Sequence, residues 1–197
     1  MNFFRTIRFV TLVSVATFMV SACTTKDALP ERVSATSFDS LPVLRTVSAF
    51  EGIDQNGKPL TSSALKGHIW LASFFFSRCE TICPALNTVQ TTLQRDFANR
   101  IQFVSISSDP EFDTPAVMKL YGEQFGAKDG VWWFVNMPHE KMLDVAANGL
   151  GLIPPGSPEM HSTRFVLVDT AMNVRGYYDS ADSSDVAKLR TVLSELK

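Results

Sequence analysis

The sequence predicts an α/β domain with a mixed, mainly parallel sheet, helices on both faces of the sheet and an N-terminal hairpin. Three observations predict this fold class. Residues 69–76 form a continuous apolar run of strand length, apolar positions at helical spacing follow it, and strand and helix patterns then alternate to the end of the chain. With 197 residues, of which 45% are hydrophobic and 19% are charged, the chain is long enough for one well-buried core.

The segment at residues 1–22 does not belong to that core. Arg5 and Arg8 precede an apolar run of 12 residues at 9–20, a pattern typical of a secretory signal. A helix that spans a bilayer needs roughly 20 apolar residues, so we do not expect a permanent transmembrane helix here. Loss of this segment lowers the net charge from -2 to -4, so the charge does not favour nucleic-acid binding.

The end of this segment resembles a lipid-attachment motif. Val20-Ser21-Ala22-Cys23 is similar to the bacterial lipobox, in which the cysteine is diacylated and becomes the new N-terminus. We therefore predict a lipoprotein signal peptide at 1–22, a lipidated tether at 23–40 and a folded domain at 41–197. The protein would be attached to a membrane on the extracytoplasmic side, which is the periplasmic side in a bacterium with two membranes. Either membrane could hold the anchor. A plain cleavage site, or a short anchor with a chance cysteine, is the alternative.

The domain begins with an apolar stretch from Val43 and a hairpin. Gln55-Asn56-Gly57-Lys58 is a strong hairpin turn, because Asn-Gly tolerates two positive φ angles. Thr61 is expected to cap a short helical turn that runs to Leu65. Residues 69–76 then have the unbroken apolar character of a central strand that is covered on both faces.

A helix follows the loop at residues 77–83, since Pro84 suits the first helical position, where its missing N–H is not needed. Its apolar face is formed at helical spacing by Leu86, Val89, Leu93 and Phe97. The later elements are strands at 101–107 and 131–135, helices at 114–125 and 137–148, a loop at 149–160, and a hairpin of strands at 164–169 and 174–178. A final helix, capped by Asp182 or Ser183, ends near Leu196.

This order of elements implies a parallel sheet that is finished by antiparallel strands, with helices on both faces. The architecture is thioredoxin-like. We expect Trp132, Trp133 and the run Phe74-Phe75-Phe76 to lie in the core.

Cys79 and Cys83 lie between the end of a buried strand and the start of a helix. Because a helix N-terminus stabilises anions, one or both thiols should have a lowered pKa. A separation of four residues can bring both sulfurs to one side of a single turn, close enough for a disulfide or for one metal ion. With Cys23 committed to lipid, this pair is structural, redox-active or metal-binding. A structural disulfide is the alternative, although so small a loop would stabilise the fold little.

His161 is expected to face the two thiols. If the strand at 164–169 runs antiparallel to the strand at 69–76, it begins at the edge of the sheet where the cysteines lie. Two thiolates and one imidazole form a soft, three-coordinate set that suits Cu(I), whereas zinc would need a fourth ligand. An exposed loop leaves a route for release, so the metal should be transferable. The other histidines, His68 and His139, are expected on the surface.

An acidic segment, Asp109-Pro110-Glu111-Phe112-Asp113, follows the strand at 101–107 and should emerge beside the cysteine loop. The carboxylates of Asp109 and Asp113 could steer a partner or move protons during thiol exchange. Alternatively, Asp113 or Thr114 could simply cap the next helix. The sequence leaves this choice open.

Three segments resemble the Sco (SenC) family of copper and redox proteins. They occur in the order of that family and are Phe74-Phe75-Phe76-Ser77-Arg78-Cys79-Glu80-Thr81-Ile82-Cys83-Pro84, then Ser107-Ser108-Asp109-Pro110-Glu111-Phe112-Asp113-Thr114-Pro115, then His161-Ser162-Thr163 ahead of Phe165-Val166-Leu167-Val168-Asp169. The resemblance implies that Cys79, Cys83 and His161 bind one copper ion per domain, as Cu(I) and also as Cu(II). It further implies assembly of the binuclear copper centre in subunit two of cytochrome c oxidase, or service to another extracytoplasmic cuproprotein.

Two functions remain open at this point, so whether the protein is an enzyme is also open. The first is a copper metallochaperone. The alternative is a thiol-disulfide oxidoreductase that keeps the cysteines of a copper-site target reduced, with Cys79 and Cys83 as the redox pair. Typical thioredoxins have two residues between their cysteines rather than three, which disfavours a general reductase. A peroxiredoxin would have threonine three positions before its peroxidatic cysteine, where this chain has Phe76.

Overall fold

The computed structural model describes residues 38–153 and 162–196, and all of them belong to the unit Ala35–Lys197. The predicted signal peptide, Cys23, most of the tether, most of the loop at 149–160 and His161 lie outside the described residues. Within the described part of the chain, no helix is both long and apolar enough to cross a membrane.

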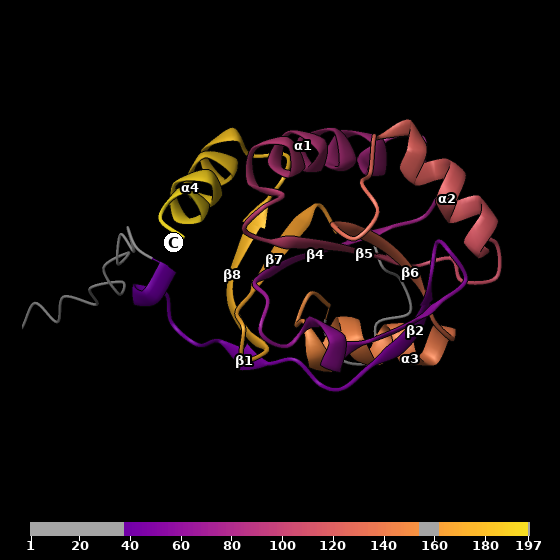
Figure 1. The fold of residues 1–197 in the computed structure, drawn as a ribbon, viewed down its shortest axis with the longest axis horizontal. Helices are drawn as coiled ribbons and strands as arrows, with labels where there is room; N and C mark the ends of the chain where they lie inside the picture. The colour runs from indigo at the N-terminus through magenta and orange to yellow at the C-terminus, as the bar shows by residue number, and fades with distance from the viewer. Residues whose placement is uncertain (1–37, 154–161, 197) are drawn as a thin grey trace, which may run out of the picture. The chain divides into compact units, whose positions relative to one another are not determined.

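The strands of the described residues form one mixed sheet in the order β1-β8-β7-β4-β5-β6-β2-β3 (Figure 1). They are β1 (Arg45–Thr46), β2 (Glu51–Asp54), β3 (Pro59–Thr61), β4 (Trp70–Phe75), β5 (Gln102–Ser107), β6 (Trp132–Asn136), β7 (Arg164–Val168) and β8 (Asn173–Asp179). β4, β5 and β6 are parallel, and the other pairings are antiparallel. The mixed sheet is confirmed, but its parallel part is limited to the three central strands because hairpins extend the sheet at both edges.

Helices cover both faces of this sheet, as predicted. They are α1 (Ile82–Phe97), α2 (Pro115–Gln124), α3 (His139–Asp144) and α4 (Ser183–Ser194), with short 3₁₀ turns at Phe38–Ser40 and Ser62–Leu65 and a π-helical turn at Val145–Gly149. Figure 1 shows α1, α2 and α4 on one face of the sheet and α3 on the other.

The position of β4 in the sheet explains why its sequence is apolar except at Ser73. All six of its residues are buried. Leu71 and Phe75 join the core under α1, α2 and α4, whereas Trp70, Ala72 and Phe74 join the core on the side of α3. Alternate side chains of a strand point to opposite faces, so a strand covered on both faces is apolar at nearly every position. The one polar residue, Ser73, is also buried, and its hydroxyl has hydrogen-bond partners.

Most of the predicted elements are confirmed, but some differ from the prediction. The turn between β2 and β3 is present, but only Gly57 has a positive φ, of 74°, while the Asn56 N–H donates to the Asp54 carboxylate at 2.8 Å. β1 was not predicted. α1 begins at Ile82, before Pro84, so Cys83 lies within its first turn. Proline is tolerated throughout the first turn, because these N–H groups have no partner within the helix.

The predicted positions of the aromatic residues and of two histidines are confirmed. Trp132, Phe74 and Phe75 are buried, and Trp133 and Phe76 pack against the two cores as partly buried side chains. His68 and His139 are exposed.

Three chain segments meet at one edge of the sheet, namely the edge formed by the C-terminal ends of β4 and β5. β5 is parallel to β4, with Phe75 opposite Ser107, so both strands end at the same edge. β7 is antiparallel to β4, with Ala72 opposite Val166, so β7 begins at that edge. The cysteine loop, the acidic segment and the residues before Arg164 therefore share one end of the domain.

Candidate metal and thiol site

The two cysteines lie at the junction of β4 and α1. Cys79 is half-buried in the loop, and Cys83 is buried in the first turn of the helix. Both are free thiols in this structure. The backbone N–H of Cys83 donates to the Cys79 sulfur at 3.3 Å. The first turn of α1 therefore provides a hydrogen-bond donor to the sulfur of Cys79, as expected of a helix N-terminus.

The two thiols differ in acidity. Burial raises the pKa of Cys79, but hydrogen bonds from Cys83 and from the backbone N–H groups of Thr81 and Ile82 outweigh it, so the pKa lies below its ordinary value. Burial raises the pKa of Cys83 to about 12, and the hydrogen bond that Cys83 makes to Cys79 adds to this effect. The predicted lowering thus holds for Cys79, whereas the pKa of Cys83 shifts the opposite way.

This difference predicts selective alkylation of the reduced protein. At pH 8, a thiol with a pKa of about 12 is ionised in only about one molecule in ten thousand. Iodoacetamide should therefore modify Cys79 at least about a hundredfold faster than Cys83, since the thiolate is the nucleophile. The rate at Cys79 should reach its plateau at a lower pH than that of an ordinary thiol. Mass spectrometry of tryptic peptides over a pH series measures both rates, and equal rates at the two cysteines would contradict this assignment.

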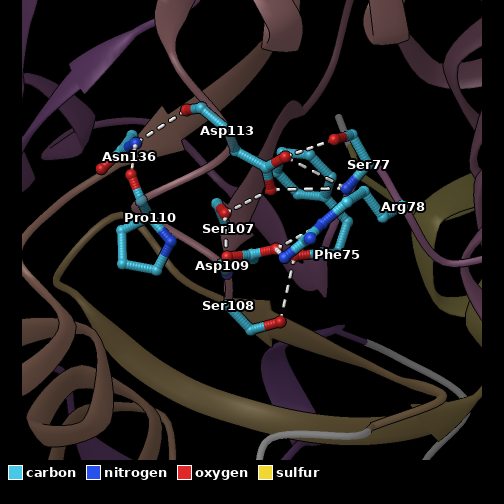
Figure 2. Close-up of polar contacts among 9 residues, drawn as sticks. All are labelled: Phe75, Ser77, Arg78, Ser107, Ser108, Asp109, Pro110, Asp113 and Asn136. Atoms are coloured by element: carbon cyan, nitrogen blue, oxygen red, sulfur yellow. Dashed lines mark hydrogen bonds and ion pairs between the residues drawn. The ribbon is translucent and has the colours of Figure 1, made fainter.

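Asp113 fixes the start of the cysteine loop (Figure 2). Its side chain is fully buried. One carboxylate oxygen accepts hydrogen bonds from the Ser77 hydroxyl and from the Ser77 N–H, the latter at 3.2 Å, and the other accepts from the Ser107 hydroxyl at 2.5 Å. The end of β4, the end of β5 and the acidic segment are thereby joined through one carboxylate.

Asp109 has a different role, because it contacts the exposed side of the same loop. The Arg78 guanidinium forms an ion pair with Asp109, with Nε donating to Oδ2 at 3.0 Å (Figure 2). The same guanidinium lies 4.5 Å from the centre of the Phe112 ring. The Phe112 ring is 43% exposed. Within the described residues, Asp109 is therefore the ion-pair partner of Arg78.

The choice between Asp113 and Thr114 as the helix cap is settled by α2. The Thr114 hydroxyl accepts the Val117 N–H at 3.4 Å, so Thr114 is the cap residue. Asp113 is not the cap, because its carboxylate is occupied by Ser77 and Ser107.

The polar residues that hydrogen-bond the acidic segment were not predicted from the sequence. Asn136, at the end of β6, donates from Nδ2 to the carbonyl oxygens of Pro110 at 2.8 Å and of Asp113 at 2.7 Å (Figure 2). Ser77, Ser107 and Asn136 all lie at the ends of neighbouring parallel strands. That shared placement was the available signal, because such strands end at one edge of a sheet.

The structure describes two of the three predicted copper ligands. Among residues 38–153 and 162–196, no group of three His, Cys, Asp or Glu side chains is arranged to hold a metal ion. His161 lies outside the described residues, and Ser162 and Thr163 follow it directly at the edge where β7 begins. The antiparallel pairing on which its predicted position depends is confirmed.

Comparison with known proteins places this chain near one family. The model of the SCO1/SenC family matches residues 39–131. A putative copper-binding protein of Stutzerimonas stutzeri is 30% identical over 146 residues, which cover 70% of this chain and 71% of that protein.

Two solved structures share the fold over nearly their whole length. A SCO1/SenC family lipoprotein from Bacillus anthracis str. Ames is 25% identical with a TM-score of 0.71, and the match covers 79% of this chain and 96% of that chain. BsSco, a member of the Sco family of cytochrome c oxidase assembly proteins in which a disulfide switch has been identified, is 27% identical with a TM-score of 0.67. That match covers 81% of this chain and 99% of BsSco.

Proposed function

The chain belongs to the SCO1/SenC family, and from this premise we propose that it is a copper metallochaperone for assembly of the binuclear copper centre of cytochrome c oxidase. The observation that carries the proposal is the pair Cys79 and Cys83 at the N-terminus of α1, with the Cys83 N–H bonded to the Cys79 sulfur at 3.3 Å. The names of the relatives support it, because one is a putative copper-binding protein and another assembles cytochrome c oxidase.

The donor set fits copper. Two thiols four residues apart offer the soft ligands that Cu(I) prefers, and the lowered pKa of Cys79 makes one of them available as thiolate. We propose His161 as the third ligand. The support for it is topological, since β7 begins at the edge where β4 ends. A three-coordinate site on a loop is open on one side. The ligands of a partner protein could therefore replace Cys79, Cys83 and His161 one at a time, and the copper ion would move to the partner.

A second candidate function is reduction of the cysteines in the copper-site target. It is favoured by the difference between the two thiols, because Cys79 is half-buried with a lowered pKa whereas Cys83 is buried. The Cys79 thiolate would attack the target disulfide, and Cys83 would then displace the target, leaving the target reduced and Cys79–Cys83 as a disulfide. Turnover would require an external thiol reductant. The disulfide switch identified in BsSco supports this chemistry.

We further propose that Cys23 carries a lipid that holds the domain on the extracytoplasmic side of a membrane. The lipobox-like sequence Val20-Ser21-Ala22-Cys23 supports this, as does the similarity to a lipoprotein of the same family. Labelling cells with a palmitate analogue tests it. The wild-type chain should be labelled and the Cys23→Ala chain should not.

A strain that lacks this protein tests the proposed function. If the protein delivers copper, the strain should lose most of its cytochrome c oxidase activity and recover it when copper is added to the medium. If it reduces the target instead, an added thiol reductant should restore activity and copper should not. A plasmid copy should restore activity, and the same copy with Cys79→Ser should fail. Normal oxidase activity in the deletion strain would contradict both functions.

A further inference from the structure

A buried amide lies one helical turn after Cys83. Asn87 is completely buried, on the face of α1 that also buries Cys83. Residues four apart on a helix are neighbours, and side chains tilt towards the helix N-terminus, so the Asn87 side chain extends towards Cys83. Its Nδ2 donates to the Tyr121 hydroxyl at 2.9 Å. Within the described part of the chain, its Oδ1 has no hydrogen-bond partner.

That unpaired oxygen indicates a second arrangement of the amide. Buried polar atoms are almost always hydrogen-bonded, and an unpaired one destabilises the fold. The two ends of a side-chain amide have nearly the same size, so a half-turn exchanges them without changing the packing. After this half-turn, the Tyr121 hydroxyl donates to Oδ1, and Nδ2 is free to donate to another acceptor.

The sulfur of Cys83 is the acceptor that the helix places next to this amide, because residues four apart on a helix are neighbours. Tyr121 packs in the same core as Cys83. Asn87, which bonds the Tyr121 hydroxyl, lies one helical turn after Cys83 on the buried face of α1. A buried thiolate is destabilised unless groups around it donate hydrogen bonds. Cys79 has donors from the first turn of α1, whereas Cys83 lies inside that turn and depends more on its neighbours.

We propose that Asn87 is a positioning residue for Cys83, donating a hydrogen bond to the Cys83 thiolate when that sulfur binds copper, with the Tyr121 hydroxyl holding the amide in place. The proposal rests on the proposed copper function. Hydrogen bonds around metal ligands tune affinity and orientation, and changes to such partners typically weaken binding about 10- to 100-fold. Asn87 would thus increase the affinity of the Cys83 thiolate for copper.

The test uses the full-length, lipidated protein in detergent. Asn87→Leu removes the amide and keeps a similar volume, and it should weaken Cu(I) binding about tenfold in competition with a chelator. The thiolate-to-copper charge-transfer band of the Cu(II) complex should also shift. Gln94→Leu is the matched control, since it removes another buried amide of α1 that bonds Gly126 and Lys128, remote from the thiols. This control should bind copper like the wild type.

Two further arms keep the outcome decisive. In a Cys79→Ser background, Asn87→Leu should slow alkylation of Cys83 about tenfold, a result that needs no copper and so separates this proposal from the proposed function. If Asn87→Leu does not fold, Tyr121→Phe replaces it, and a smaller shift of the charge-transfer band is expected. An unchanged affinity, band and alkylation rate in the folded Asn87→Leu protein would overturn the proposal. Unchanged spectra in Tyr121→Phe would overturn it equally.

Discussion

Cys83→Ser should weaken Cu(I) binding by the full-length protein more than about a hundredfold, because even the loss of a residue that merely supports a ligand typically weakens binding 10- to 100-fold. A hydroxyl is a hard donor and does not replace a thiolate for Cu(I). Cys79→Ser should have an effect of similar size. Competition with a Cu(I) chelator under anaerobic conditions measures both.

Thr81→Ala is the matched control for the two cysteine variants. Thr81 lies between the cysteines and is exposed, and its side chain makes no capping hydrogen bond to α1. Its replacement should leave the copper affinity within about twofold, since surface substitutions change stability by about 0.5 kcal/mol or less. A Cys83→Ser protein that bound copper as tightly as the Thr81→Ala protein would remove Cys83 from the site.

Asp113→Leu should lower the free energy of unfolding by about 3 kcal/mol or more. The substitution leaves the buried Ser107 hydroxyl and the partly buried Ser77 N–H and hydroxyl without their acceptor, and an unsatisfied group in a buried site costs about 1 to 3 kcal/mol. For a domain of this size, the midpoint of thermal unfolding should fall by about 10 °C. Circular dichroism during heating measures it.

Asp109→Asn provides the control for this prediction. Its partner Arg78 has a side chain that is 59% exposed, and exposed ion pairs contribute about 1 kcal/mol or less. The Asp109→Asn protein should therefore unfold within a few degrees of the wild type. Equal unfolding midpoints for the Asp113→Leu and Asp109→Asn proteins would contradict the role of Asp113 as the residue that joins the cysteine loop to β5.

The parts of the fold that could be predicted are those encoded by local patterns. The run at 69–76, apolar except at Ser73, indicated a strand covered on both faces, and β4 is that strand. β1 could not be predicted, because it has only two residues and exists through its pairing with β8. The predicted helix at 137–148 is divided into α3 and a π-helical turn, since the same periodicity is compatible with both.

In the candidate site too, the features encoded by local sequence patterns could be predicted, and those that depend on tertiary contacts could not. The position of Cys79 and Cys83 at a helix N-terminus followed from the sequence, and so did the shared edge of β4 and β7. The raised pKa of Cys83 did not follow, because it depends on burial. Asp113 forms hydrogen bonds with Ser77 and Ser107, which are distant in sequence or lie in other elements. No local sequence pattern predicts such hydrogen bonds.

X-ray absorption at the copper edge of the Cu(I)-loaded, full-length protein tests the central claim most directly, because it counts the atoms bound to the metal. We expect two sulfur neighbours and one nitrogen neighbour per copper. The nitrogen should be lost in His161→Ala, and one sulfur should be lost in Cys83→Ser. A spectrum of the wild-type protein with a single sulfur neighbour, or with nitrogen and oxygen neighbours alone, would contradict a site built on Cys79 and Cys83.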